Sequence, residues 1–323
     1  MGITKLADLI RSDAPDAISH KDISDYTGKV IALDTSVVVN QFRAATPSLS
    51  PLTGLFFRTL TFLEHDIKPV FVFDGKPPEE KTAVLQKRAE TAGWRSANLT
   101  GAASSQTKDC LQLLKLLGVP VIQAPGDAEA LCAQLVREGT VDAVASEDMD
   151  TLPFGANILI RQLNAKKDSE VVEYSLTKLL EKLKMNQEEF VDLCILLGCD
   201  YCDKIAGLGP KRALALIQKH HTIEKVVLEI NRKYLLPSRP ILCHISGGTK
   251  KPVRYSWMRH KQKLLNSPGL SRMKKPWFGS SVTSNMLRRT ESVIEWRSSV
   301  RRGKVSGRRG KGRGQKGITG RLA

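Results

Sequence analysis

The 323-residue chain has few of the features that mark secreted, membrane or zinc-dependent proteins. Its six cysteines are scattered, which is typical of a reduced compartment. Its six histidines form neither an HExxH motif nor a paired CxxC…HxxxH spacing, so zinc chemistry is not indicated. No apolar run approaches the ~18 residues that a transmembrane helix requires. The first ten residues lack the basic and apolar segments of a signal peptide. We therefore expect a protein of a reduced compartment with no membrane partner.

Basic residues are concentrated at one end of the chain. Residues 237–323 contain 22 lysines and arginines but only two acidic residues, whereas residues 1–236 contain 28 basic and 31 acidic residues. A polycationic tail can bind nucleic acid through its phosphates without reading a base sequence. The alternative is a disordered, soluble segment with no partner. The remainder of the chain is close to neutral, and its carboxylates are available as metal ligands.

Apolar, β-branched runs alternate with helical patterns over the first 186 residues. We predict strands at residues 29–33, 69–73, 119–123, 142–146, 157–161 and 170–174. We predict helices at residues 3–11, 51–64, 79–92, 107–117, 126–138 and 175–184, with a polar loop at 93–106. This alternation indicates an α/β fold with a doubly wound, mostly parallel sheet. From residue 187 the pattern is wholly helical.

Carboxylates follow several of the predicted strands. Asp34 and Asp74 close two apolar runs, and Asp148 comes shortly after a third. The carboxyl ends of parallel strands form the ligand-binding edge of an open α/β sheet, so these acids should meet there. A bound cation would relieve their repulsion, and a site made of oxygen ligands suits Mg²⁺ or Mn²⁺. The sequence therefore predicts a divalent metal site at this edge.

Further acidic residues extend the candidate set. Asp148 and Asp150 are two apart in a segment predicted to be extended, so their side chains should point the same way; alone they could equally form a solvated acidic turn. Asp127 and Glu129 open a predicted helix, where capping of the free N–H groups is the favoured interpretation of that pair by itself. Asp200 lies just beyond the end of another apolar helix.

Residues 207–213 (GLGPKRA) form a predicted tight turn between two helices. Gly207 and Gly209 would let the backbone approach a phosphate, and the following helix N-terminus would present free N–H groups to it. Lys211 and Arg212 add positive charge. Such a turn alone is as compatible with a plain helix connection as with nucleic-acid binding, but the acidic set that precedes it favours nucleic acid.

Together these motifs resemble those of the flap endonuclease family, the structure-specific 5′ nucleases of the XPG/Rad2 type. The resemblance covers residues 1–234 and rests on MGITKLADLI, IALDTS, GLFFRTL, IKPVFVFDGKPP, SEDMDTLPFG, QEEFVDLCILLGCDYC and IAGLGPKRALALIQKH. It implies a PIN-like nuclease core formed by residues 1–92 and 107–186, and a helix–two-turn–helix, helix–hairpin–helix-like DNA-binding module at 187–234. It also implies metal-dependent cleavage of a phosphodiester where a 5′ single-stranded flap meets duplex DNA, with 5′–3′ exonuclease activity, in replication and repair.

The resemblance also implies roles for individual residues. One Mg²⁺ ion, replaceable by Mn²⁺, would be held by Asp34, Asp74, Asp127 and Glu129, and a second by Asp148, Asp150 and Asp200. Catalytic groups near the scissile phosphate would be Gly2, Lys81 and Arg88. DNA contacts are implied for Arg58, Gly198, Gly207, Gly209, Lys211 and Arg212. The turn from Gly207 to Gly209 would also bind K⁺.

Some positions depart from the family pattern. Asn40 replaces a tyrosine that stacks on a base, and Asp127 replaces a glutamate, which shortens that ligand by one methylene. Residues 93–106 are much shorter than the helical arch that threads the flap in the family. These departures leave two other interpretations open: a DNA-binding protein without catalysis, and a nuclease for gaps, bubbles or junctions.

The family pattern ends near residue 235. Residues 246–252 (SGGTKKP) can be encoded so that a shifted frame reads WRYKEA, and residues 266–282 so that it reads LTWTEPDEEALVRFLC. Both readings resemble the family, so we interpret residues 235 to at least 297 as translated out of frame. We expect the whole basic tail, residues 235–323, to be non-native or disordered.

The resemblance also bears on partners and location. It implies branched DNA with a 5′ flap as the substrate, a monomer, and residence in the nucleus, with nucleolar and mitochondrial pools. The family binds a sliding clamp through a glutamine, an aliphatic residue and two aromatic residues near its C-terminus. The last ten residues here, GQKGITGRLA, contain no aromatic residue, so clamp binding is not predicted.

Overall fold

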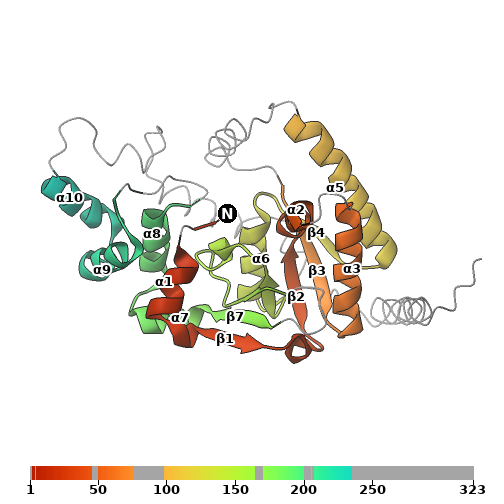
Figure 1. Cartoon of the computed structure of the whole chain (residues 1–323), viewed down its shortest axis with the longest axis horizontal. Helices are drawn as coiled ribbons and strands as arrows, with labels where there is room; N and C mark the ends of the chain where they lie inside the picture. Colours follow the sequence, from red (N-terminus) through yellow and green to blue (C-terminus); the bar gives the residue numbers. More distant parts are fainter. Residues whose placement is uncertain are drawn as a thin grey trace, which may run out of the picture.

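A seven-stranded sheet forms the centre of the computed structural model, which describes residues 2–3, 5–45, 50–75, 98–163, 170–199, 205 and 207–234 (Figure 1). The strand order is β1–β7–β6–β5–β2–β3–β4. The strands are β1 (Ile18–Lys21), β2 (Val30–Asp34), β3 (Lys68–Phe73), β4 (Val121–Gln123), β5 (Ala143–Ala145), β6 (Ile158–Arg161) and β7 (Val171–Ser175). All pairs from β6 to β4 are parallel, whereas β7 and β1 add antiparallel pairs at the other edge. The predicted mostly parallel α/β sheet is confirmed.

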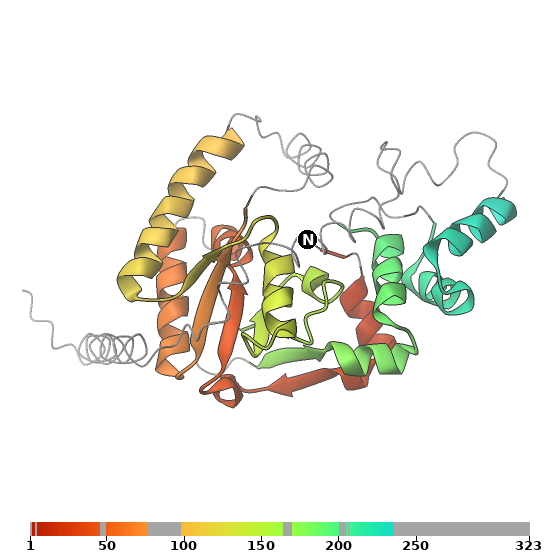
Figure 2. The same ribbon diagram turned by 180° about the vertical axis from the view of Figure 1, so that it is seen from behind.

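Helices cover both faces of the sheet (Figures 1 and 2). The α-helices are α1 (Leu6–Asp13), α2 (Thr35–Ala45), α3 (Pro51–Glu64), α5 (Asn98–Leu117), α6 (Ala128–Arg137), α7 (Leu176–Leu183), α8 (Gln187–Leu197), α9 (Pro210–His220) and α10 (Ile223–Tyr234). Short 3₁₀ helices occur at η1 (Pro15–Ala17), η2 (Ile23–Tyr26) and η3 (Met149–Thr151). Within the ranges that the structure describes, no helix is long and apolar enough to cross a bilayer.

The central strands are buried on both faces, which explains their continuous apolar sequences. In β2, Ile31 and Leu33 belong to an apolar cluster that includes side chains of α3 and α5. Ala32 belongs to the other cluster, which includes side chains of α1 and α6 to α10. Because neighbouring side chains of a strand point to opposite faces, one apolar run supplies both layers.

Three parts of the secondary structure differ from the prediction. The edge strand β1 and helix α2 were not predicted. The predicted loop at 93–106 is wrong from Asn98 onwards, because α5 begins there. The α2 sequence contains the β-branched run Val37–Val39, which has a low helix propensity. The predicted helix at 79–92 lies outside the described residues, and so does the tail from residue 235.

The wholly helical segment folds as α8, α9 and α10, placed beside α1 (Figures 1 and 2). A capping box of Asn186 and Glu189 begins α8, and Pro210 occupies the first position of α9. Asp192, which is buried in α8, accepts a hydrogen bond of 3.0 Å from the N–H of Ile223 at the start of α10. The Asp192 bond ties α8 to α10, and each of the three helices also contacts the other two. Whether they act as a separate DNA-binding domain stays a prediction.

Candidate metal centre and nucleic-acid interface

Three of the predicted metal ligands lie at the carboxyl ends of neighbouring parallel strands. Asp34 ends β2, Asp74 directly follows β3, and Asp148 follows β5 by three residues. In the sheet, β2 lies between β3 and β5. These acids therefore come together along one edge of the sheet, as the sequence predicted.

Ser36, at the start of α2, links the first two carboxylates. The backbone N–H groups of Ser36 and Val37 donate to Asp34 Oδ1 over 3.0 and 3.3 Å. The Ser36 hydroxyl donates to Asp74 Oδ2. Asp34 is buried, and a buried carboxylate is tolerated when such donors replace water. One serine thus holds two candidate ligands from different strands in a fixed relation.

Asp127 and Glu129 bring the start of α6 to the same edge. Asp127 is the N-cap residue of α6, but its side chain makes no capping hydrogen bond, so the capping interpretation is not supported for it. Instead, Asp74 Oδ1 accepts a hydrogen bond of 2.8 Å from the N–H of Ala128. This bond ties the end of β3 to the segment between Asp127 and Glu129.

Cys132 shows that these carboxylates converge. Burial raises the pKa of the Cys132 thiol well above its ordinary value, and the negative charges of Asp34, Asp74 and Glu129 raise it further. Cys132 lies one helical turn after Glu129 on α6. Three carboxylates, at the end of β2, directly after β3 and at the start of α6, therefore act electrostatically on one buried thiol.

The second acidic pair lies against the start of the chain. The N–H of Ile3 donates to Asp150 Oδ1 over 3.0 Å, and the N–H of Asp150 donates to Asp148 Oδ1 over 3.1 Å. Gly2 has a φ of +89°, and a Cβ atom there would overlap the Asp148 carboxylate. Both aspartates belong to the 3₁₀ turn η3 and its N-cap, so the predicted extended segment is wrong. Both carboxylates nevertheless lie beside Gly2.

The donor set fits a hard divalent cation in its chemistry. The described candidates are all carboxylates, and five of them are buried: Asp34, Asp127, Glu129, Asp148 and Asp150. Buried carboxylates at one sheet edge repel one another, and oxygen ligands of this kind suit Mg²⁺ or Mn²⁺. In the described part of the chain, no three ligand-type side chains are arranged so that they could hold one metal ion. Three further predicted site residues lie outside the described ranges: Lys81, Arg88 and Asp200.

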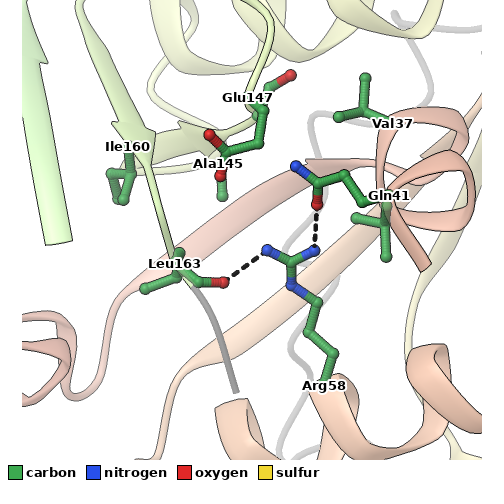
Figure 3. A pocket seen from close by; sticks show the side chains of 9 residues that line it. Val37, Gln41, Arg58, Ala145, Glu147, Ile160 and Leu163 are labelled. Carbon is green, nitrogen blue, oxygen red and sulfur yellow. Dashed lines mark hydrogen bonds between the residues drawn. The ribbon is translucent and has the colours of Figure 1, made fainter. Parts of the chain in front are cut away.

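Arg58 is buried rather than displayed on the surface. Its guanidinium donates to Gln41 Oε1 over 2.9 Å and to the backbone oxygen of Leu163 over 2.6 Å (Figure 3). Burial lowers its pKa, and the negative charge of Glu147 opposes that shift. The surrounding pocket is lined by Val37, Val38, Gln41, Arg58, Ala145, Ser146, Glu147, Ile160 and Leu163. In this arrangement Arg58 joins α3 to α2 and to the segment after β6, so the predicted DNA contact would have to be made within this pocket.

The predicted phosphate-binding turn has the expected backbone. Gly207 has a φ of +76°, in the left-handed region that favours glycine, and Gly209 is the N-cap residue of α9. Gly198, with a φ of +88°, ends α8 and is buried. Lys211 Nζ lies 2.6 Å from both carboxylate oxygens of Asp13, the last residue of α1. The glycines thus form a turn as predicted, while one of its two cations is paired with α1.

Comparison with known proteins decides the family. Residues 1–93 match the XPG N-terminal domain and residues 118–200 match the XPG I-region. A protein described as a probable flap endonuclease 1 homolog of Danio rerio is 67% identical over 236 residues, which cover 72% of this chain and 67% of the relative. The chain belongs to the XPG/Rad2 family of flap endonucleases. Flap endonuclease 1 of Homo sapiens is 43% identical over 271 residues, covering 73% of this chain and 71% of the relative.

Solved structures show that this flap endonuclease chain shares the nuclease fold of its family. The catalytic core of Rad2 in complex with a DNA substrate matches with a TM-score of 0.61 and 25% sequence identity. The match covers 82% of this chain and 78% of that structure. The PIN-like α/β nuclease core expected from the sequence is therefore confirmed.

Ser36 and Gln41 were not singled out from the sequence. Ser36 follows Asp34 in the motif DTS, and its role depends on α2 starting without a loop after β2. Gln41 lies on the same unpredicted helix, and its Oε1 accepts a hydrogen bond from the buried guanidinium of Arg58.

Proposed function

We propose that this protein is a structure-specific 5′ flap endonuclease with 5′–3′ exonuclease activity that acts on branched DNA in replication and repair. The observation that carries the proposal is the row of carboxylates at the ends of β3, β2 and β5, in a chain of the flap endonuclease family. Such a row is chemically suited to divalent ions that act on a phosphodiester.

We assign two divalent ions to the acidic residues. One ion would be held by Asp34, Asp74, Asp127 and Glu129, and the other by Asp148, Asp150 and Asp200. When bound, a pair of such ions lowers the pKa of water and neutralises charge on the attacking and leaving oxygens. We take Mg²⁺ as the ion, with Mn²⁺ as a substitute, because both prefer oxygen ligands.

The chain itself orients these ligands before DNA arrives. Ser36 holds Asp34 and Asp74, and the Ile3 N–H holds Asp150. Gly2 brings the start of the backbone to Asp148. Removal of Met1 would leave the amino group of Gly2 there, and we propose that this group contacts the scissile phosphate. Lys81 and Arg88 are proposed to stabilise the charge that develops on that phosphate.

We propose that the helical module, residues 187–234, grips the duplex beside the site. The turn from Gly207 to Gly209 would bind a backbone phosphate, with or without K⁺, at the N-terminus of α9. Arg212 would add charge, and Gly198 would shape the approach from α8. We expect this monomer to act in the nucleus, with nucleolar and mitochondrial pools, because the family to which it belongs processes DNA.

Cleavage of an end-labelled 5′-flap duplex in Mg²⁺ tests the proposal. We expect cutting near the junction, lost on addition of EDTA and in Asp148→Ala. Asp8→Ala is the matched control, because Asp8 is an exposed acid on α1 that pairs with Arg11 and is not among the candidate ligands. Its cleavage should equal that of the unaltered protein.

The same assay separates the alternatives. Salt-sensitive DNA binding without cutting, by protein shown to be folded, would replace the nuclease with a DNA-binding protein. Faster cutting of gapped, bubble or four-way-junction DNA than of the flap would keep the nuclease and change its substrate.

A further inference from the structure

An ion pair ties the first helix to the predicted phosphate-binding turn. Lys211, the second residue of α9, places Nζ 2.6 Å from each carboxylate oxygen of Asp13, the last residue of α1. The two residues are 198 positions apart in sequence. Neighbouring helices α1 and α9 also contact each other directly. The cation expected to meet a DNA phosphate therefore has a partner within the protein.

The two partners differ in how firmly they are placed. The Asp13 side chain is 22% exposed and also accepts a hydrogen bond of 2.5 Å from the Ser12 hydroxyl. Burial raises the pKa of Asp13, but hydrogen bonds from Lys211 and Ser12 outweigh burial, so the pKa lies below its ordinary value and the carboxylate is ionised at neutral pH. The Lys211 side chain is 64% exposed. The lysine can therefore swing into solvent while the aspartate stays on α1.

We propose that Asp13 competes with DNA for Lys211: it neutralises the lysine in the free protein, and a backbone phosphate at the Gly207–Gly209 turn displaces it. This inference rests on the proposed role of the turn in DNA binding. In this proposal Asp13 lowers the affinity of the protein for DNA. It also increases selectivity, because only a phosphate bound at the turn can displace Asp13, whereas another polyanion at the surface cannot.

The energies of the two pairings allow such an exchange. An ion pair with a largely exposed lysine contributes little stability, so its loss is easily offset. At the turn, a phosphate would gain the Lys211 charge together with free N–H groups at the N-terminus of α9. With Asp13 in place, one of the positive charges that would neutralise phosphate is cancelled before DNA binds.

Equilibrium binding tests the proposal in its simplest form. The Kd of a fluorescently labelled 5′-flap duplex is measured by anisotropy in EDTA, which prevents cutting, over a range of salt concentrations. Asp13→Asn keeps the shape of the side chain and removes its charge. We expect this variant to bind about fivefold more tightly, with a salt dependence steeper by about one released counterion.

Asp16→Asn is the matched control. Asp16 Oδ2 lies 2.6 Å from Lys182 Nζ, so the variant removes the same charge from an equally close pair three residues away. Lys182 belongs to α7 rather than to the turn. We expect its Kd to stay that of the unaltered protein; an equal gain in Asp13→Asn and Asp16→Asn would show that only net charge matters and would overturn the proposal.

A double variant locates the effect. Lys211→Ala should weaken binding, and adding Asp13→Asn to it should give no gain, because the contested cation is gone. A gain that persists without Lys211, or a single Asp13→Asn variant that binds no better, overturns competition. Asp13→Ala should bind as tightly as Asp13→Asn, which shows that the gain does not come from the asparagine itself. Thermal unfolding of both variants is measured and should match that of the unaltered protein.

The same experiment keeps the two proposals apart. If the unaltered protein binds the flap duplex and Lys211→Ala weakens it, the turn binds DNA, and the Asp13 variants alone judge the competition. If neither the unaltered protein nor any variant binds the duplex in a salt-sensitive way, the proposed role of the turn fails, and the competition fails with it.

Discussion

At the scale of single residues, Gly2 is fixed by two constraints at once. Its φ of +89° disfavours any L side chain, and a Cβ atom would overlap the Asp148 carboxylate. Gly2→Ala must therefore move either the start of the chain or one proposed metal ligand. We expect about 100-fold slower flap cleavage in single-turnover assays, because small displacements at a reacting centre have effects of this order.

Gly28 provides the control for this prediction. It has a similar φ of +78°, but a Cβ atom there would meet nothing within 4 Å. Gly28→Ala should cost about 1–2 kcal/mol of stability through its backbone conformation and should leave cleavage unchanged. Equal loss of activity in both variants would mean that backbone strain, rather than contact with Asp148, explains the result.

Ser36 is the second residue whose effect can be isolated. Ser36→Ala keeps the N–H that donates to Asp34 and removes the hydroxyl that donates to Asp74. Groups that hold metal ligands typically change affinity or activity by about 10–100-fold. We therefore expect half-maximal cleavage to require at least about tenfold more Mg²⁺, measured by titrating the ion.

The exposed Ser24 serves as the comparison, and Ser24→Ala should leave the Mg²⁺ titration unchanged. A Ser36→Ala variant with normal Mg²⁺ dependence but lower thermal stability would show that the hydroxyl supports the fold alone.

At the scale of secondary-structure elements, Gly54 allows α2 and α3 to pack closely. A Cβ atom at Gly54 would overlap the ring of Phe42 on α2. Alanine is the better helix former by about 1 kcal/mol, yet we expect Gly54→Ala to lose about 1–3 kcal/mol of stability because overpacking dominates. Urea denaturation measures the difference.

A compensating change makes this prediction sharper. Phe42→Leu shortens the opposing side chain, so Gly54→Ala should be less destabilising in that background than alone. Additive losses would show that the two residues do not interfere and that the loss arises elsewhere in α3.

The elements also show how much of the fold could be predicted from the sequence. The apolar runs of β2 and β3 are long and buried on both faces, so their positions and the acids that end them could be predicted. Helix α2 could not, because its β-branched residues disfavour helix and Asp34, a residue of the preceding strand, accepts the N–H groups at its start. Strand β1 is short and polar, and it is fixed by pairing with β7, which lies 150 or more residues further along the chain.

The buried position of Arg58 could not be predicted from the sequence for a related reason. A charged residue in an amphipathic helix is normally expected at the surface. Its burial depends on Gln41 from the unpredicted α2 and on a backbone oxygen after β6. Partners that come from two other segments of the chain cannot be deduced until those segments are placed.

At the scale of the whole molecule, β2 belongs to both apolar clusters, with Leu33 on one side and Ala32 on the other. A strand shared by two layers can open only when both layers come apart. Hydrogen-exchange mass spectrometry should therefore find the amides of β2 among the slowest in the chain, and those of the edge strand β1 much faster. Similar rates in the two strands would contradict this view.

Asp34 ends β2, so the first proposed metal ligand sits on the part of the protein that opens last. Asp74 follows β3, which also belongs to both clusters, but its side chain is exposed whereas that of Asp34 is buried. On gradual warming, cleavage should be lost before the sheet unfolds, because exposed ligands such as Asp74 move first. Cooling should restore cleavage as long as β2 has remained folded.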